Sequence, residues 1–315
     1  MKGLTDIPGI RVGHVSDFDA LTGCTAILCE GGAAAGVDIR GSASGTEEIE
    51  TLDPGHVTQQ AHGILLAGGS AFGLEAASGV RRYLEHKGVG FDTGAAKVPI
   101  VPAAILYDLG IGKANVRPGL AMGEAAAAAA TDAAVAEGCV GAGTGATVGK
   151  ILGMKQAMKS GVGSYTVELP GGALVAAMAI VNAFGDVRDP ATNKIVAGAR
   201  KTPDGREFAD TEQVMKQRPP AGFAGRNTTL AVVATDAALT KLQARKLAQF
   251  ASLALARCIY PVNTMFDGDT VFALSLGARA ADLNVLGSAA AEALAAAILR
   301  AVRLAKSMGG VPGLA

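Results

Sequence analysis

The sequence predicts an α/β fold of the α+β kind, in which two sheets, or one large mixed sheet, are covered by helices. Half of the 315 residues are hydrophobic, enough for a sizeable core. Short apolar and β-branched runs bounded by glycine turns are typical of strands, and they alternate with longer segments of helical periodicity. Some of the strands are joined by hairpins instead of helical crossovers, so mixed pairing is expected.

The N-terminal part of the chain predicts short strands followed by a helix. The strand candidates are residues 9–14, 24–29, 35–40 and 63–67, each bounded by turns that contain glycine. In residues 71–87 the apolar side chains recur at helical spacing, and the charged side chains lie on the opposite face. We therefore expect a helix after the GGSAFG turn.

Two alanine-rich segments, residues 121–137 and 287–306, predict close-packed helices. Alanine has the highest helix propensity but a small transfer free energy, and both segments carry charges. We therefore expect these helices to pack against other elements of the protein. They are not expected to span a membrane.

The C-terminal half predicts two packed blocks joined by a linker. Residues 186–227 are polar, charged and rich in Pro and Gly, which predicts a surface linker with limited structure. A helix is expected at 240–258, with Thr240 as its N-cap. The strand candidates are 162–169 and 173–182, joined as a hairpin by a Pro-Gly-Gly turn, and the buried runs 228–237 and 270–277.

Composition argues against several partners. Lys plus Arg and Asp plus Glu both number 28, and 4% of residues are aromatic, so neither nucleic acid nor an anionic membrane is an expected partner. The four cysteines form no zinc-ligand motif and predict buried, reduced thiols. We expect no metal and no organic cofactor. The N-terminal residues lack the apolar core of a signal peptide, which predicts a cytoplasmic protein.

The junction of Asn227 and Thr228 is the most informative position in the chain. A hydroxyl residue begins a buried strand directly after the polar linker. If the Thr228 hydroxyl attacks the Asn227 carbonyl, an N-to-O acyl shift followed by hydrolysis leaves Thr228 with a free α-amine. That amine, with a pKa of about 8, can serve as the base for the hydroxyl. Asn and Thr are also common at ordinary loop-to-strand boundaries, so this alternative stays open.

Three other features of the sequence bear on the type of chemistry. All four histidines lie in the first 86 residues, and no GxSxG motif is present, which argues against a Ser-His-Asp triad. Asp267 and Asp269 place two carboxylates on one tight loop, able to hold a hydroxyl and share protons, although an ordinary turn would use the same residues. The GAGTGATVG segment is similar to a phosphate-binding loop, but its glycine spacing is wrong and Ile151 follows Lys150 where Ser or Thr is required.

Seven motifs in one order resemble the L-aminopeptidase D-Ala-esterase/amidase family, which includes the β-peptidyl aminopeptidases, and the related 6-aminohexanoate-oligomer (nylon) hydrolases. The resemblance covers nearly the whole chain. The motifs are GVDIRG, LAGGSAFGLEAASGV, VPIVPAAILYDL, GAGTGATVGK, VNAFGD, NTTLAVVATDA and FDGDTVFAL. The resemblance implies a single domain, residues 1–315, with a four-layer αββα sandwich similar to the N-terminal nucleophile hydrolases. The domain would be cut into chains 1–227 and 228–315 that stay together.

The resemblance also implies site residues. Thr228 matches the nucleophile, and Asp267 and Asp269 match the pair of the nylon-hydrolase branch, where the aminopeptidase branch has Ser and Glu. Lys150 matches an active-site lysine, and Asn182 matches an asparagine that hydrogen-bonds the oxyanion. No tyrosine follows the glycine-rich motif here, unlike in several aminopeptidases, so the side-chain preference does not transfer from them.

The expected substrates are short peptides or amides with a free amino end, including β-peptides and 6-aminohexanoate oligomers. A homotetramer of processed units is expected from the family. Two alternatives remain: an acyltransferase similar to ornithine acetyltransferase, which would need an amino acceptor for fast turnover, and a nonenzymatic nucleotide-binding module built on GAGTGATVG. The second predicts an intact chain that binds nucleotide tightly.

Overall fold

The computed structural model describes residues 1–217 and 227–315, and the predicted linker therefore lies partly outside the described residues. Its helices are α1 (Ala76–His86), α2 (Leu120–Ala128), α3 (Thr211–Gln217), α4 (Lys241–Ala251), α5 (Leu253–Cys258) and α6 (Leu283–Arg303). Its longer strands are β1 (Arg11–Asp17), β2 (Thr22–Ile39), β4 (Ala61–Ala67), β10 (Val162–Glu168), β11 (Leu174–Asn182), β14 (Thr228–Ala237) and β16 (Thr270–Arg279). Its short strands are β3 (Thr46–Glu47), β5 (Phe91–Asp92), β6 (Lys97–Val98), β7 (Ala103–Ile105), β8 (Thr147–Val148), β9 (Met158–Lys159), β12 (Asp186–Arg188), β13 (Ile195–Ala197) and β15 (Ile259–Tyr260).

Nine strands form one hydrogen-bonded sheet in the order β10-β11-β14-β16-β2-β4-β7-β3, with β1 beside β2. The 18-residue strand β2 joins its two halves: its first part pairs with β1 and β4, and its last part pairs with β16. The sequence predicted two strands here, at 24–29 and 35–40, and this prediction was wrong. The chain stays extended because a bulge between Leu28 and Ala33, with Gly32 at φ 83°, absorbs the two glycines.

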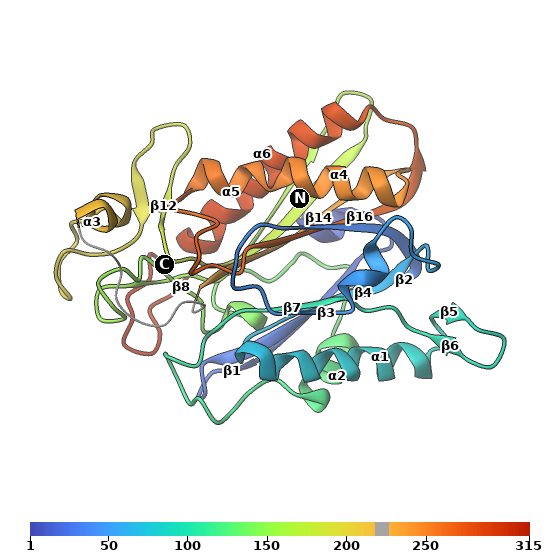
Figure 1. The fold of residues 1–315 in the computed structure, drawn as a ribbon, viewed down its shortest axis with the longest axis horizontal. Helices are drawn as coiled ribbons and strands as arrows, with labels where there is room; N and C mark the ends of the chain where they lie inside the picture. Colours follow the sequence, from blue (N-terminus) through green and yellow to red (C-terminus); the bar gives the residue numbers. More distant parts are fainter. Residues whose placement is uncertain (218–226) are drawn as a thin grey trace.

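Apolar residues alternate along the central strands, so each sheet half buries both faces. In β14, Leu230 and Val232 face the other half of the sheet, whereas Ala231 and Val233 face helices α4 to α6. In β4, Leu65 faces α1 and α2. Figure 1 shows the resulting layers, with α4 to α6 on one side of the strands and α1 and α2 on the other. The predicted four-layer α+β sandwich is confirmed.

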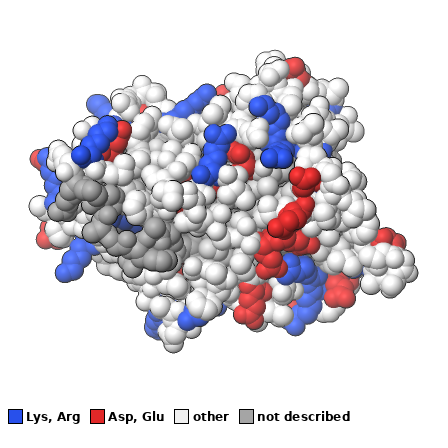
Figure 2. All heavy atoms as spheres, in the orientation of Figure 1, with Lys and Arg blue, Asp and Glu red and all other residues white. Residues whose placement is uncertain are grey.

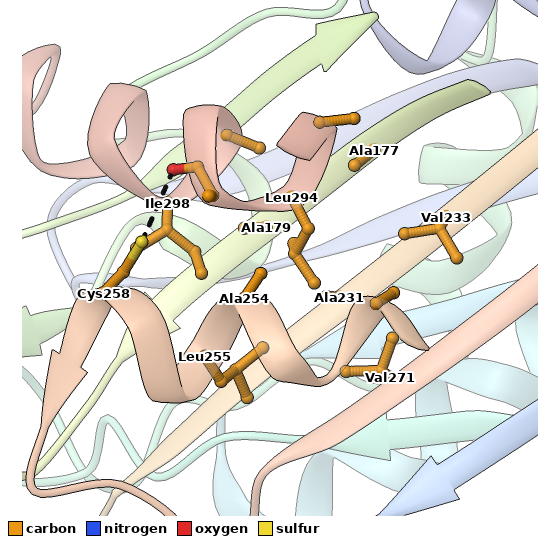
Figure 3. Close-up of a cluster of buried hydrophobic side chains, with 14 of the residues drawn as sticks. Ala177, Ala179, Ala231, Val233, Ala254, Leu255, Cys258, Val271, Leu294 and Ile298 are labelled. Atoms are coloured by element: carbon orange, nitrogen blue, oxygen red, sulfur yellow. Dashed lines mark hydrogen bonds between the residues drawn. The ribbon is translucent and has the colours of Figure 1, made fainter. Parts of the chain in front are cut away.

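Helix α6 is the core helix of the first layer. Among the described residues it is the one helix long and apolar enough to span a membrane, but most of that window is buried inside the protein. Leu294 and Ile298 pack over β11 and β14 beside α5, as Figure 3 shows. The alanine-rich sequence 287–306 therefore forms the close-packed helix that was predicted, beginning earlier, at Leu283, behind the N-cap Asp282.

The first alanine-rich segment is helical only over Leu120–Ala128, so the predicted helix 121–137 was too long. Beyond it the backbone pairs with the N-terminal strand: Val12 N–H donates to Thr131 O at 2.9 Å, and Thr131 N–H returns a bond to Val12 O at 3.1 Å. Long-range pairing overrides the alanine propensity here.

Two other predicted helices are interrupted. Residues 71–87 begin as a 3₁₀ helix, Ser70–Glu75, and become α-helical at Ala76. The helix predicted at 240–258 breaks at Ser252, whose hydroxyl donates to Ala248 O at 3.0 Å, a bond that bends helices. Thr240 is the N-cap, as predicted, and its side chain accepts from Gln243 N–H.

Residues 186–217 have more regular structure than their composition predicted. They form β12, β13 and α3, and β12 also pairs with β15. The carboxylate of Asp186, fully buried, accepts hydrogen bonds from Ala199 N–H, Thr211 N–H and the Thr211 hydroxyl. One buried acid therefore holds this segment together.

The surface charges are mixed in sign, and the cysteines are buried, in agreement with the expectations from composition. On the face drawn in Figure 2, the described acidic and basic side chains lie in small groups of both signs. All four cysteines are free and buried, as predicted, and burial raises the pKa of Cys24, Cys29 and Cys258 to about 12.

Candidate active site

Thr228 is the first residue of β14, a central strand that pairs antiparallel with β11 and parallel with β16. It lies directly opposite Asn182, the last residue of β11, and it is 3% exposed. The preceding residue, Asn227, forms a parallel bridge with Asp267. The topology therefore brings the end of β11 and the starts of the parallel strands β14 and β16 to one point.

Two donors converge on the carbonyl oxygen of Asn227. The Thr228 hydroxyl donates to it at 2.5 Å, and the Gly268 N–H donates to it at 2.9 Å. A side chain at Gly268 would place its Cβ 2.9 Å from Thr228 Oγ1, so only glycine fits there. Hydrogen-bond donors on a carbonyl oxygen stabilise the negative charge that forms when a nucleophile attacks its carbon.

Asp269 is held by backbone donors. Its Oδ1 accepts from Thr229 N–H at 2.6 Å, and its Oδ2 accepts from Asn263 N–H at 3.0 Å. Burial, and then the repulsion of Asp267, raise its pKa to about 7. Asp269 therefore changes charge near neutral pH, which suits a group that exchanges protons with a nucleophile.

Asp267 is held in a similar way. Its Oδ1 accepts from Phe184 N–H at 3.2 Å, and its Oδ2 accepts from Thr264 N–H at 3.1 Å and from the Thr264 hydroxyl at 2.5 Å. Burial raises its pKa, while these hydrogen bonds and the nearby Lys150 oppose the rise. The two carboxylates form one coupled acidic pair beside Thr228.

Lys150 and Asn182 form the opposite side of the site. Lys150 Nζ donates to Asn182 O at 2.8 Å and to Asn182 Oδ1 at 2.7 Å. Thr147 N–H also donates to Oδ1, at 3.1 Å, and Asn182 Nδ2 donates to Tyr107 O at 3.0 Å. These bonds orient the side-chain amide with its oxygen toward Lys150.

Burial lowers the pKa of Lys150 to about 7, against the opposing charge of Asp267. A lysine with such a pKa is a candidate for proton transfer near neutral pH. The structure thus brings together all five residues singled out from the sequence: Thr228, Asp267, Asp269, Lys150 and Asn182.

Several contributors escaped the sequence analysis. Gly268 and Thr264 act through a backbone N–H and a local hydroxyl, which no spacing rule singles out. Tyr107 contributes a carbonyl oxygen, and Lys159 is fully buried behind the glycine-rich segment. The available signals were the motifs VPIVPAAILYDL, which contains Tyr107, and FDGDTVFAL, which contains Gly268, but neither motif assigned these two residues a role.

The glycine-rich segment is not a phosphate cradle, because its backbone N–H groups are used within the protein. Ala142 N–H donates to Thr25 Oγ1 and Gly141 N–H to Ser16 Oγ. Further amides of the segment with partners in the protein are those of Gly143, Thr144, Ala146, Thr147, Gly149 and Lys150. A phosphate would need several such donors at once, so the geometry argues against the nucleotide-binding alternative. No group of three potential metal ligands occurs among the described residues.

Solved structures share this fold. The chain aligns over 99% of its length with 88% of the L-aminopeptidase D-Ala-esterase/amidase from Ochrobactrum anthropi, a serine aminopeptidase with a variant of the Ntn hydrolase fold, at a TM-score of 0.71 and 19% identity. It aligns over its whole length with 91% of a Burkholderia sp. beta-aminopeptidase, at a TM-score of 0.69 and 23% identity. The chain therefore shares its fold with these two aminopeptidases, and the fold is a variant of the Ntn hydrolase fold.

Sequence comparison identifies the protein family. The chain belongs to peptidase family S58, which it matches over residues 2–315, and it is a hydrolase of amide bonds. An uncharacterized aminopeptidase of Mycobacterium tuberculosis is 39% identical over 99% of this chain and 96% of its own length. A 6-aminohexanoate-oligomer endohydrolase of Kocuria sp. is 30% identical over 95% of this chain and 85% of its own length.

Proposed function

We propose that the chain is a precursor that cuts itself between Asn227 and Thr228, and that Thr228 is then the nucleophile of an amide hydrolase. The observation that carries the proposal is the convergence of the Thr228 hydroxyl and the Gly268 N–H on the Asn227 carbonyl oxygen. A buried hydroxyl held against the carbonyl that precedes it is arranged for an N-to-O acyl shift.

The cut proceeds in two steps. Thr228 Oγ1 attacks the Asn227 carbonyl carbon and gives up its proton to the neighbouring acid–base groups, while Gly268 N–H stabilises the oxyanion. The carbon–nitrogen bond then breaks, the nitrogen takes a proton, and an ester links Asn227 to the Thr228 oxygen. Water hydrolyses the ester, which leaves the Asn227 carboxylate and a free α-amine on Thr228.

The processed enzyme uses the same residues on its substrate. The α-amine of Thr228 accepts the proton of its own hydroxyl as the oxygen attacks a substrate amide. Asn182 lies opposite Thr228 in the β11–β14 ladder, so its side-chain amide is a donor for the substrate oxyanion. Asp267 and Asp269 orient Thr228 and balance charge, and Lys150 completes the proton network.

The proposed substrates are short peptides or amides with a free amino end, including β-peptides and 6-aminohexanoate oligomers. Two features support this class of substrate: the acidic pair on the 267–269 loop, which can attract an ammonium group, and the similarity to the 6-aminohexanoate-oligomer endohydrolase of Kocuria sp.. No further cofactor is required by this chemistry.

A homotetramer of processed units in the cytoplasm is also proposed. Exposed hydrophobic side chains, among them Val57 at 73% and Met265 at 70%, are available for contacts between units. The free thiols suit a reducing compartment. Light scattering on the purified protein measures the number of units directly.

Denaturing mass spectrometry of freshly purified protein tests the proposal. We expect two fragments, residues 1–227 and 228–315, from the natural sequence and from Thr228→Ser, but an intact 31.4 kDa chain from Thr228→Ala. Thr228→Ala should also have no measurable hydrolysis of amino-acid amides or 6-aminohexanoate oligomers. An uncut natural chain that hydrolyses these amides would refute the mechanism.

A further inference from the structure

Lys159, at the end of β9, is a fully buried lysine that the proposed reaction does not use. Burial lowers its pKa to about 8. A buried ammonium is costly unless hydrogen bonds compensate for its lost hydration. We therefore expect the ammonium group of Lys159 to make hydrogen bonds that an apolar residue of similar size cannot make.

Three hydrogen bonds join Lys159 to the backbone of other segments. Its Nζ donates to Thr144 O at 2.9 Å and to Ala146 O at 2.7 Å. Its own N–H donates to Pro312 O at 2.8 Å, which ties β9 to the C-terminal segment. The ammonium thus holds two carbonyls of the glycine-rich segment in place.

Asp108 packs against the same segment. A Cβ at Gly145 would lie 2.6 Å from Asp108 Cβ, so the loop and the acid are in direct contact. Asp108 is 5% exposed and accepts from Thr22 Oγ1 and Gly69 N–H, both at 2.7 Å. Burial raises its pKa, and the charge of Lys159 opposes that rise. A buried acid and a buried base therefore share the turn at residues 144–146.

The peptide unit between Ala146 and Thr147 connects this pair to the active site. In a planar trans peptide the C=O and the N–H point in opposite directions. Lys159 Nζ binds the Ala146 oxygen, and Thr147 N–H donates to Asn182 Oδ1 at 3.1 Å. An ammonium group that donates to the carbonyl oxygen polarises the peptide unit, and this strengthens the hydrogen bond that the N–H of the same unit donates.

We propose that Lys159 is a positioning residue for Asn182: by holding the 146–147 peptide, it orients the Asn182 amide that stabilises the substrate oxyanion. The inference rests on the proposed role of Asn182 in hydrolysis. Lys159 itself touches neither Thr228 nor substrate. Its removal lowers turnover without weakening substrate binding, because a misdirected amide loses contact mainly with the charged transition state.

A double-mutant cycle on the processed enzyme tests this inference. Lys159→Met is expected to lower kcat about 10- to 100-fold, the usual range for residues that orient a functional group, with KM within about twofold. In an Asn182→Ala background, the same substitution is expected to change kcat less than about twofold. Lys155→Met, which replaces an exposed lysine in the turn that precedes β9, is the matched control and keeps natural kcat.

Two results overturn the inference in different ways. If Lys159→Met lowers kcat by the same factor with and without Asn182, Lys159 does not act through Asn182, and the proposed function stands. If Asn182→Ala alone leaves kcat unchanged, the oxyanion role fails as well. In both cases Thr228→Ala still reports separately on the nucleophile.

A second variant covers the event that Lys159→Met does not fold. Asp108→Asn keeps the side-chain volume and removes the charge that faces Lys159, which favours the neutral amine and weakens its hold on the carbonyls. We expect a fall in kcat of about 3- to 10-fold that disappears in the Asn182→Ala background. An equal fall in both backgrounds contradicts the inference.

Discussion

Two loops flank the start of β14, and they are held in opposite ways. In the aspartate loop, residues 263–269, backbone N–H groups bind side-chain carboxylates. In the glycine-rich loop, residues 141–149, side chains bind the backbone: Thr25 and Ser16 accept from its amides, and Lys159 binds its carbonyls.

This difference separates chemistry from shape. The aspartate loop contains two carboxyl groups whose pKa values are raised by burial, so substitutions in this loop should alter reaction rates. The glycine-rich loop presents close backbone contacts, so its substitutions should alter stability first. The following predictions test that division.

The largest effect is expected for Asp269→Asn. The amide oxygen can still accept from Thr229 N–H, but the side chain carries no charge, so self-cleavage should slow about 100- to 1000-fold, the range for loss of an acid–base group. Cleavage is followed by gel densitometry over time. Asp236→Asn, at the other end of β14 and also bound to a backbone N–H, is the control and should cleave normally. Equal cleavage rates in both variants would remove Asp269 from the mechanism.

In the glycine-rich loop, Gly145→Ala should destabilise the protein by about 1–3 kcal/mol. Its Cβ would lie 2.4 Å from Leu21 O and 2.6 Å from Asp108 Cβ. Thermal unfolding measures this loss of stability in the Thr228→Ala background, in which self-cleavage is not expected to affect the result. Tm should fall by several degrees. Gly31→Ala, which has no atom within 4 Å of the added Cβ, should leave Tm unchanged. An unchanged Tm in Gly145→Ala would contradict the shape role.

The pH dependence of self-cleavage sharpens the role of the charged loop. Asp269 has a pKa raised to about 7, so it is protonated below that pH and charged above it. If the carboxylate is the working form, the rate should fall about tenfold for each pH unit below 7 and level off above it. Asp269→Asn should lose this dependence, whereas the control Asp236→Asn should keep it. A pH-independent rate in the natural protein would argue against the carboxylate.

The same groups affect stability with a defined sign. In an uncut Thr228→Ala background, the raised pKa of Asp269 means that the folded state binds more protons than the unfolded chain between pH about 4 and 7. Stability should therefore decrease as pH rises through this window. Adding Asp269→Asn should flatten the decrease in Tm, and parallel pH curves for the two proteins would contradict the assignment.

The smallest effect is expected from nucleotide. Because the amides of the glycine-rich loop have partners within the protein, millimolar ATP with magnesium should shift Tm by less than about 1 °C. A saturable rise in Tm would reopen the phosphate-binding interpretation of this loop.

Much of the architecture could be read from local patterns. The β10–β11 hairpin, the buried strands that begin at Thr228 and Thr270, and the Thr240 cap all follow from short-range turn chemistry and periodicity. The candidate site was equally accessible, because its five residues lie at motif positions of the family. These features depend on residues close together in the chain.

What the sequence did not reveal depended on contacts between distant segments. Strand β2 continues through two glycines because β4 and β16 pair with its separate halves, and α2 stops early because Thr131 pairs with Val12. The Gly268 donor and the buried Lys159 acquire their roles only where the loops meet. The sequence by itself determined which side chains are candidates for the chemistry. Only the tertiary structure decided which backbone groups those side chains meet. Every peptide unit has the same N–H and C=O groups, so their hydrogen-bond partners are defined only once the chain has folded.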